Sequence, residues 1–159
     1  MTSKLSASAA NVKDFLDKKG FLFNVVELTS STRTAKEAAD SIGCSVAQIA
    51  KSLVFEGVDT KEAVLIVASG INRVDLKKFE LVTGLKIKKA DADFVKKQTG
   101  FSIGGIPPAG HIKPIKTYLD KDLKKYDSIW AAAGTPFAVF ELNPEELEEL
   151  TGGEWIDLT

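Results

Sequence analysis

Two short, uninterrupted apolar runs set the fold class of this chain. Residues 63–68 read Ala-Val-Leu-Ile-Val-Ala, and residues 52–55 read Ser-Leu-Val-Phe. Surface strands alternate apolar and polar residues, whereas continuous runs of this length are typical of strands buried on both faces. We therefore expect a central sheet that is covered on each side.

Helix-start signals recur between the predicted strands. Thr34-Ala-Lys-Glu37 and Ser45-Val-Ala-Gln48 are capping boxes, in which a hydroxyl and a Glu or Gln satisfy the first free amides of a helix. Asn143-Pro-Glu-Glu146 combines an N-cap, a proline at the first helical position and an acidic first turn. Helices are also expected over residues 7–19, 74–83 and 91–98. Further strands are expected over residues 21–26, 85–90, 115–119, 128–133 and 137–142, and residues 155–158 are a candidate for a closing strand.

This order of elements predicts an α+β fold. Six to seven strands and about five helices do not follow a strict βαβ order, so we expect one mixed, mostly antiparallel sheet flanked by helices. A length of 159 residues fits a single domain over residues 1–159.

Composition limits the cellular compartment, the metal sites and the partners that can be expected for the protein. Cys44 is the single cysteine, which excludes an internal disulfide and fits the reducing cytoplasm. With one cysteine and one histidine, no metal site of the Cys/His type is expected, and no cofactor is expected. No apolar run approaches the roughly 20 residues of a membrane helix, so no membrane partner is expected.

The charges are unevenly distributed although the net charge is only −1. Residues 73–125 carry 13 Lys/Arg and 6 Asp/Glu, a net charge of +7, and the rest of the chain has a net charge of −8. The basic middle is interpreted either as a face for a phosphate backbone or as an ordinary solvated surface.

A glycine- and proline-rich segment, Phe101–His111, is the first candidate for a binding site. Gly104 and Gly105 allow backbone angles closed to other residues, and Pro107 and Pro108 stiffen the chain. Such a loop can present backbone amides to a small polar ligand. The alternative is a plain surface turn.

Three side chains are weighed as chemical groups. Lys51 precedes a buried strand, where it acts either as a fixed cation in a cleft or as a lysine that reaches to solvent. His111 is either a general base or, since no Cys or Ser partner is evident, a histidine that lines a ligand site or has a structural role. Cys44 is a reactive thiol only if its pKa is low, and otherwise a small packed residue. The standard hydrolase, nucleotide and metalloprotease motifs are absent.

Five segments together resemble the YbaK family, the free-standing relatives of the editing domain of bacterial prolyl-tRNA synthetases. They are Thr34–Ala39, Gln48–Phe55, Arg73–Lys78, Thr99–His111 and Glu141–Leu147. The resemblance extends from about residue 20 to residue 151. It implies a trans-editing deacylase of mischarged aminoacyl-tRNA, with the 3′ acceptor end of a tRNA such as tRNA(Pro) as substrate and prolyl-tRNA synthetase as a partner.

The resemblance also implies site residues. Lys51 matches the family's lysine, Gly104 to Pro108 match its Gly-x-x-x-Pro loop, and Ala131 to Gly134 match a late strand end. We accordingly expect Lys51, Gly104 and Gly105 to be catalytic, and a list of further residues to bind substrate: Ile106, Pro107, Pro108, His111, Ala133 and Gly134.

The chemistry of an aminoacyl ester fits a site of this kind. The ester is already activated, so a water assisted by the neighbouring ribose hydroxyl can attack it if backbone amides meet the developing oxyanion. The alanines at 131–133 suggest a small amino acid. Two alternatives remain, a non-catalytic module that binds tRNA ends or a synthetase, and a metabolic enzyme that uses Cys44.

Overall fold

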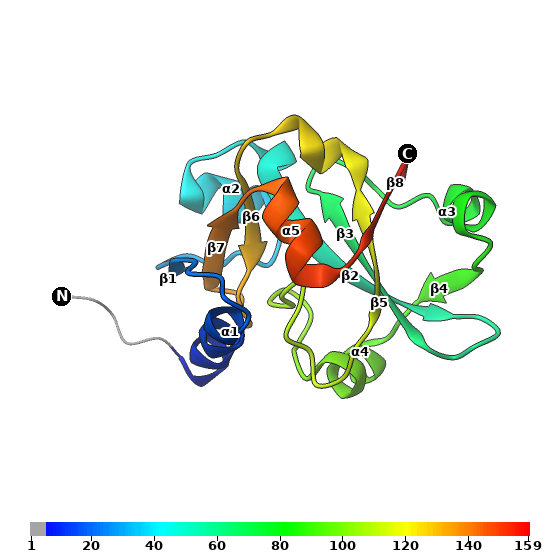
Figure 1. The fold of residues 1–159 in the computed structure, drawn as a ribbon, viewed down its shortest axis with the longest axis horizontal. Helices are drawn as coiled ribbons and strands as arrows, with labels where there is room; N and C mark the ends of the chain where they lie inside the picture. The colour runs from blue at the N-terminus through cyan, green and yellow to red at the C-terminus, as the bar shows by residue number, and fades with distance from the viewer. Residues whose placement is uncertain (1–5) are drawn as a thin grey trace.

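A computed structural model describes residues 6–159 as eight strands, five α-helices and two 3₁₀ helices (Figure 1). In chain order they are α1 (Ala7–Lys18), β1 (Val25–Glu27), α2 (Ala35–Ile42), η1 (Val46–Gln48), β2 (Ile49–Gly57), β3 (Ala63–Ser69), α3 (Leu76–Thr83), β4 (Ile87–Lys89), α4 (Ala92–Thr99), β5 (Lys116–Asp120), η2 (Lys121–Lys125), β6 (Ile129–Ala132), β7 (Ala138–Leu142), α5 (Pro144–Thr151) and β8 (Glu154–Ile156). None of the helices described is long and apolar enough to cross a lipid bilayer.

All eight strands belong to one mixed sheet in the order β1-β7-β6-β2-β3-β5-β8, with β4 paired to β2 outside this path. Four pairs are antiparallel, β1–β7, β2–β3, β2–β4 and β6–β7. Three are parallel, β2–β6, β3–β5 and β5–β8. Strand β2 is the centre of this arrangement because it contacts three other strands.

Helices cover both faces of the sheet. The larger core joins one face to α1, α4 and α5, whereas α3 and α2 close the other face in two smaller clusters. Every residue of β3 is buried, as its continuous apolar run predicts. On the α3 side, Phe79 is fully buried and its ring meets Tyr118 edge-on at 5.0 Å. Burial of a side chain of this size stabilises the fold by about 2–3 kcal/mol.

The expected α+β class is confirmed, with one strand more than the six to seven expected. The capping predictions are confirmed at both α2 and α5. The Thr34 hydroxyl accepts from the Glu37 amide at 3.1 Å, and the Asn143 side chain accepts from the Glu146 amide at 2.8 Å.

Two boundaries differ from expectation. The run at residues 21–26 gives a strand only over Val25–Glu27, because Phe21 and Phe23 stack on each other at 5.1 Å and pack into the core instead of pairing. Strand β2 begins at Ile49 rather than Ser52, so Lys51 lies inside the strand and not before it.

Candidate functional site

The sheet opens between β2 and β6. These strands pair only at Ile49↔Trp130 and Ala50↔Ala131, and β4 joins the same edge of β2 only from Phe55 onward. Between these contacts, residues 51–54 have no strand partner on this edge within residues 6–159. A cavity of about 490 Å³ lies at this opening.

The cavity wall has an apolar part and a cationic part. The apolar part comes mainly from α2, β2 and β6, and includes Ala35, Ala38, Ile42, Ile49, Trp130 and Ala131. Four basic residues also line it, Arg33, Lys36, Lys51 and Arg73, and no Asp or Glu belongs to the lining that the structure describes. The cavity therefore suits a ligand that carries both a negative charge and a small apolar group.

Most of this positive charge is not neutralised by ion pairs. Lys36 contacts Asp40 at 3.2 Å, whereas Arg33, Lys51 and Arg73 form no ion pair with any residue in the described range. Guanidinium groups in such a position are available to bind phosphate.

Lys51 is electrostatically unusual. Partial burial lowers the pKa of its ammonium group below the ordinary value of 10.5, and the neighbouring Arg73 guanidinium lowers it further. The carboxylate of Asp120 acts in the opposite direction. An anion that binds next to Lys51 and Arg73 would therefore stabilise the charged form of the lysine.

The glycine–proline loop brings Gly104 and Ile106 to the same cavity as Lys51. Gly104 has φ +97°, a backbone conformation that residues other than glycine rarely adopt. A Cβ on Gly105 would lie 2.7 Å from the Thr135 backbone, and the Gly105 carbonyl accepts from the Gly134 amide at 2.9 Å. Gly105 therefore fastens the loop to the turn between β6 and β7.

The backbone amides of the loop are not equivalent. The Gly105 amide donates to the Ser102 carbonyl at 3.2 Å, so it is already used within the loop. No hydrogen bond from the amides of Gly104 and Ile106 to another residue of the described chain is present. The amide of Ile103, which also lines the cavity, is in the same state, so three loop residues at the cavity have amides without a partner in the described chain.

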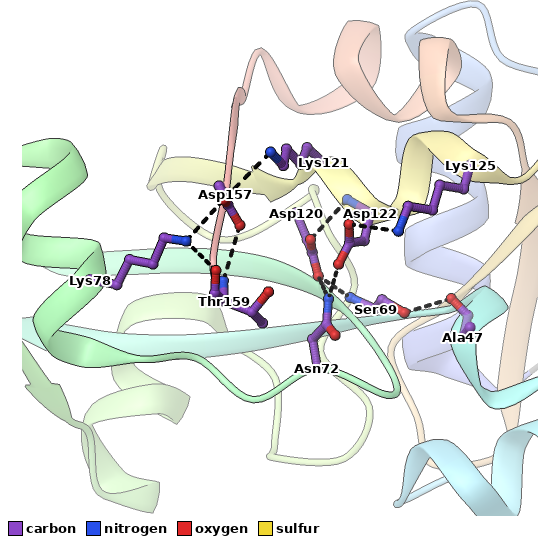
Figure 2. A network of polar contacts seen from close by, with 10 residues as sticks. All are labelled: Ala47, Ser69, Asn72, Lys78, Asp120, Lys121, Asp122, Lys125, Asp157 and Thr159. Carbon is purple, nitrogen blue, oxygen red and sulfur yellow. Dashed lines mark hydrogen bonds and ion pairs between the residues drawn. The ribbon is translucent and has the colours of Figure 1, made fainter.

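Figure 2 shows a polar network that fixes the loop after β3. This loop supplies Asn72 and Arg73 to the cavity. Asp120, only 1% exposed, accepts from the Ser69 amide at 2.9 Å and from the Asn72 side chain at 2.8 Å. Asn72 also donates to Asp122 at 2.8 Å. The carboxylate at the end of β5 thus holds the backbone that precedes Arg73.

Some residues expected at the site lie elsewhere. Pro108 and His111 line a second hollow of about 280 Å³, beside α1. The His111 ring contacts the Pro107 carbonyl through Nε2 at 2.8 Å, so it braces the loop from behind. Burial lowers the pKa of this histidine, and the contact with the Pro107 carbonyl partly offsets that effect.

The residues expected at the late strand end, Ala131 to Gly134, also fall into two groups. Ala131 and Ala132 line the cavity, whereas Ala133 is fully buried. Gly134 approaches α1, where a Cβ would lie 2.9 Å from the Ser8 carbonyl. Cys44 is outside the cavity lining, and burial raises the pKa of its thiol.

Several lining residues could not be identified as a group from the sequence. Arg33, Asn72 and Trp130 come from three distant segments, and only the way β2 and β6 diverge brings them together. Arg73, which also lines the cavity, begins one of the segments that resemble the YbaK family. The resemblance therefore pointed to this part of the loop, but not to Arg33, Asn72 or Trp130.

The sequence of this chain is related to those of several known proteins. Residues 29–150 match the aminoacyl-tRNA editing domain family. Protein YwhH of Bacillus subtilis, which has no assigned function, is 38% identical over 136 residues, or 85% of this chain and 86% of that protein. Protein EbsC of Enterococcus faecalis, described as a proposed Cys-tRNA(Pro)/Cys-tRNA(Cys) deacylase, is 32% identical over 79% of this chain and 77% of its own length.

A solved structure covers nearly the whole chain. It is the crystal structure of a proposed trans-editing enzyme for prolyl-tRNA synthetase, and it matches with a TM-score of 0.92 and 49% identity over 98% of this chain and 99% of that one. The fold, the matched residues and these relatives agree with the resemblance found in the sequence. The chain belongs to the aminoacyl-tRNA editing domain family.

Proposed function

We propose that this protein is a trans-editing hydrolase, which removes a small non-cognate amino acid from mischarged tRNA(Pro). The observation that carries the proposal is the cavity at the opening of the sheet, where unpaired cations, free loop amides and a small apolar wall meet. An aminoacylated 3′ end offers the matching groups, namely a phosphate, an ester carbonyl and an amino-acid side chain.

The cations would hold the terminal phosphate. Arg33 and Arg73 have planar, permanently charged groups suited to phosphate oxygens, and both line the cavity without an ion-pair partner in the described chain. Two exposed apolar side chains, Ile71 at 63% and Ile103 at 58%, also belong to the cavity wall. They offer apolar surface to the terminal base.

The reaction would depend on positioning and on stabilisation of charge. A water molecule, assisted by the ribose hydroxyl beside the ester, attacks the carbonyl carbon, and the C–O bond to the ribose then breaks. The Gly105 amide is engaged with Ser102, so the candidates to meet the oxyanion are the amides of Gly104 and Ile106, with that of Ile103 as a third. Donors of this kind contribute about 3–4 kcal/mol each, and fixed proximity adds a comparable amount.

Lys51 would steady the developing charge or anchor the phosphate. Its lowered pKa indicates that its ammonium group is partly desolvated, so its attraction to an anion is less screened than at the surface. Three alanines, Ala35, Ala38 and Ala131, belong to the apolar wall, and we propose that a small side chain such as that of Ala, Ser, Thr or Cys packs against them.

The partners follow from this activity. The name of the structural relative points to prolyl-tRNA synthetase. We therefore propose that the protein acts in the cytoplasm on mischarged tRNA(Pro) that this synthetase has released. Lys51, Gly104 and Ile106 are proposed to act on the substrate directly. Gly105, Pro107, Pro108, His111, Ala133 and Gly134 are proposed to shape or support the loop.

A deacylation screen tests the proposal. Purified protein is incubated with tRNA(Pro) charged with Ala, Ser, Thr or Cys, and with prolyl-tRNA(Pro) and cognate aminoacyl-tRNAs as controls. The proposal predicts rapid loss of at least one small mischarged amino acid and stable prolyl-tRNA(Pro). If every mischarged tRNA stays intact, the hydrolase assignment is wrong and a non-catalytic binding module is favoured.

A further inference from the structure

Strand β4 places a lysine at the edge of β2 that is open at the cavity. Residues 51–54 of β2 have no strand partner on this edge in the described chain, and the next residue, Phe55, pairs with Lys89 of β4. Lys89 is exposed and forms no ion pair with any residue in the range 6–159. The unpaired stretch of the sheet therefore ends at a cation that is not neutralised.

Lys89 lies on the same face of the sheet as Lys51. Successive side chains of a strand point to opposite faces, so Lys51 and Phe55, four residues apart, share a face, and Lys89 shares it as the residue opposite Phe55. The packing agrees, because Phe55 contacts the cluster under α3 that contains Ile87, two residues before Lys89. With a rise of about 3.3 Å per residue and about 5 Å between paired strands, the Cα atoms of Lys51 and Lys89 are about 14 Å apart.

Partly exposed apolar side chains lie between the two lysines. Leu53 lines the cavity and Phe55 follows it on the same face, and neither side chain is fully buried. The cavity thus reaches to within two residues of the Phe55–Lys89 pair. Cations combined with apolar and aromatic surface are typical of sites for single-stranded nucleic acid, where they meet phosphates and bases.

The charge differs between the two ends of the cavity. At the β6 end, Trp130 lines the cavity and pairs with Glu141 of β7. At the β4 end, residues 86–97 carry five lysines and two aspartates, a net charge of +3. A polyanion that leaves the cavity is therefore attracted toward β4 rather than toward β7.

We propose that the single-stranded 3′ end of the tRNA leaves the cavity along the open edge of β2 and that Lys89 binds a phosphate upstream of the terminal nucleotide. This inference rests on the proposed function and extends its site beyond the aminoacylated nucleotide. The lysine ammonium group is a compact charge on a flexible stem, which suits a phosphate. A backbone contact of this kind adds affinity for tRNA independently of the base sequence.

The neighbouring lysine of β4 provides a matched control. Lys88 is also exposed and without an ion pair in the described chain, but alternation places it on the opposite face of the sheet. Binding of uncharged tRNA(Pro) to the full chain is measured at several salt concentrations for Lys89→Ala, Lys89→Arg and Lys88→Ala. All three variants should melt at the wild-type temperature, because each changes an exposed side chain.

The effect is expected for one variant only. Lys89→Ala should weaken binding of tRNA(Pro) roughly three- to tenfold at low salt and reduce the slope of log K against log salt by about 0.7, the value for one phosphate of a single strand. Lys89→Arg keeps the charge and should bind as the wild-type protein does. Lys88→Ala should change neither quantity.

A pair of short ligands locates the contact on the RNA. The trinucleotide CCA, the 3′ end of tRNA, contains phosphates upstream of its terminal adenosine, whereas adenosine 5′-monophosphate contains only the terminal phosphate. In NMR titrations, Lys89→Ala should bind the trinucleotide more weakly than the wild-type protein does and should bind the mononucleotide equally well.

The outcomes separate this inference from the proposed function. If the wild-type protein deacylates mischarged tRNA(Pro) but Lys89→Ala binds tRNA as the wild-type protein does, the inference alone is overturned. Equal losses in Lys88→Ala and Lys89→Ala, or weaker binding of the mononucleotide to Lys89→Ala, would overturn it as well. If the wild-type protein hydrolyses no mischarged tRNA but Lys89→Ala shows the expected loss, the hydrolase assignment fails and the contact stands as part of a binding module. If the wild-type protein neither binds nor deacylates tRNA(Pro), both are wrong.

Discussion

The side chain of Asn72 donates a hydrogen bond of 2.8 Å to the buried carboxylate of Asp120. This bond joins the end of β5 to the loop after β3, and the next residue of that loop is Arg73, which lines the cavity. A contact outside the reacting groups thereby sets the position of a cation inside the site.

Replacement of Asn72 by Ala tests this connection. Loss of the two bonds to Asp120 and Asp122 should lower the free energy of unfolding by about 1–2 kcal/mol, and kcat/KM for deacylation should fall roughly tenfold because Arg73 is no longer held in place. Lys125→Ala is the control, since the Lys125–Asp122 ion pair of 3.2 Å is exposed and such pairs contribute about 0–1 kcal/mol. Equal effects of the two changes on activity would contradict the assigned role of Asn72.

A paired glycine experiment separates backbone strain from function. Gly104 has φ +97° and Gly20 has φ +90°, so replacement of either by Ala should cost a similar 1–2 kcal/mol, approximately the penalty of the left-handed region. A Cβ on Gly104 would lie 3.2 Å from Arg33, whereas a Cβ on Gly20 meets no atom within 4 Å. Only Gly104→Ala should reduce deacylation. Comparable activity losses in both variants would show that the loop amides have no special role.

The titration of Lys51 can be followed by NMR of its side-chain nitrogen. We expect a midpoint below 10.5, because burial and Arg73 both disfavour the charged form. The Arg73→Met variant should move the midpoint upward and Asp120→Asn should move it downward. A midpoint at the ordinary value, unchanged in both variants, would contradict the description of the cavity as partly desolvated and cationic.

The same shift has a consequence for stability. Because the folded state binds the Lys51 proton more weakly than the unfolded chain does, Lys51 disfavours folding below its lowered pKa. This effect disappears as the pH rises through that pKa toward and above 10.5. Lys51→Met should therefore be at least as stable as the wild-type protein at neutral pH, a result that urea denaturation can check.

His111 provides a test in mildly acidic solution. Burial lowers its pKa below 6.5, so the unfolded chain binds more protons than the folded protein between that lowered pKa and 6.5. Stability should consequently fall as the pH drops through this window. His111→Gln should remove this part of the pH dependence, and the protein has no other histidine to replace it. Because His111 lines the second hollow, KM for the tRNA should change little. A large rise in KM would instead place His111 at the substrate.

Local signals were sufficient for much of the fold. The capping boxes at Thr34 and Asn143 and the apolar run of β3 identify their elements because the interactions involved are close in sequence. The strand order could not be predicted in this way, since the parallel pairs β2–β6 and β3–β5 join segments far apart in the chain. The opening of the sheet depends on that order.

For the same reason, the candidate site could be predicted only in part from the sequence. The resemblance identified Lys51 and the loop at Gly104, and the structure brings these two to one cavity. It gave no means to distinguish the amide of Gly105, which bonds to Ser102, from that of Gly104. Nor could it show that Lys89 lies beside the open edge of β2, because both facts depend on three-dimensional packing.

The most direct test is single-turnover deacylation of mischarged tRNA(Pro) by the wild-type protein and by Lys51→Ala, with binding of the same tRNA measured in parallel. We expect the rate constant to fall by about 10²-fold or more, as for the loss of one group that stabilises the transition state, while the affinity for tRNA falls far less. If Lys51→Ala deacylates at the wild-type rate, or if only its affinity is reduced, Lys51 is not a catalytic group and the central claim is wrong.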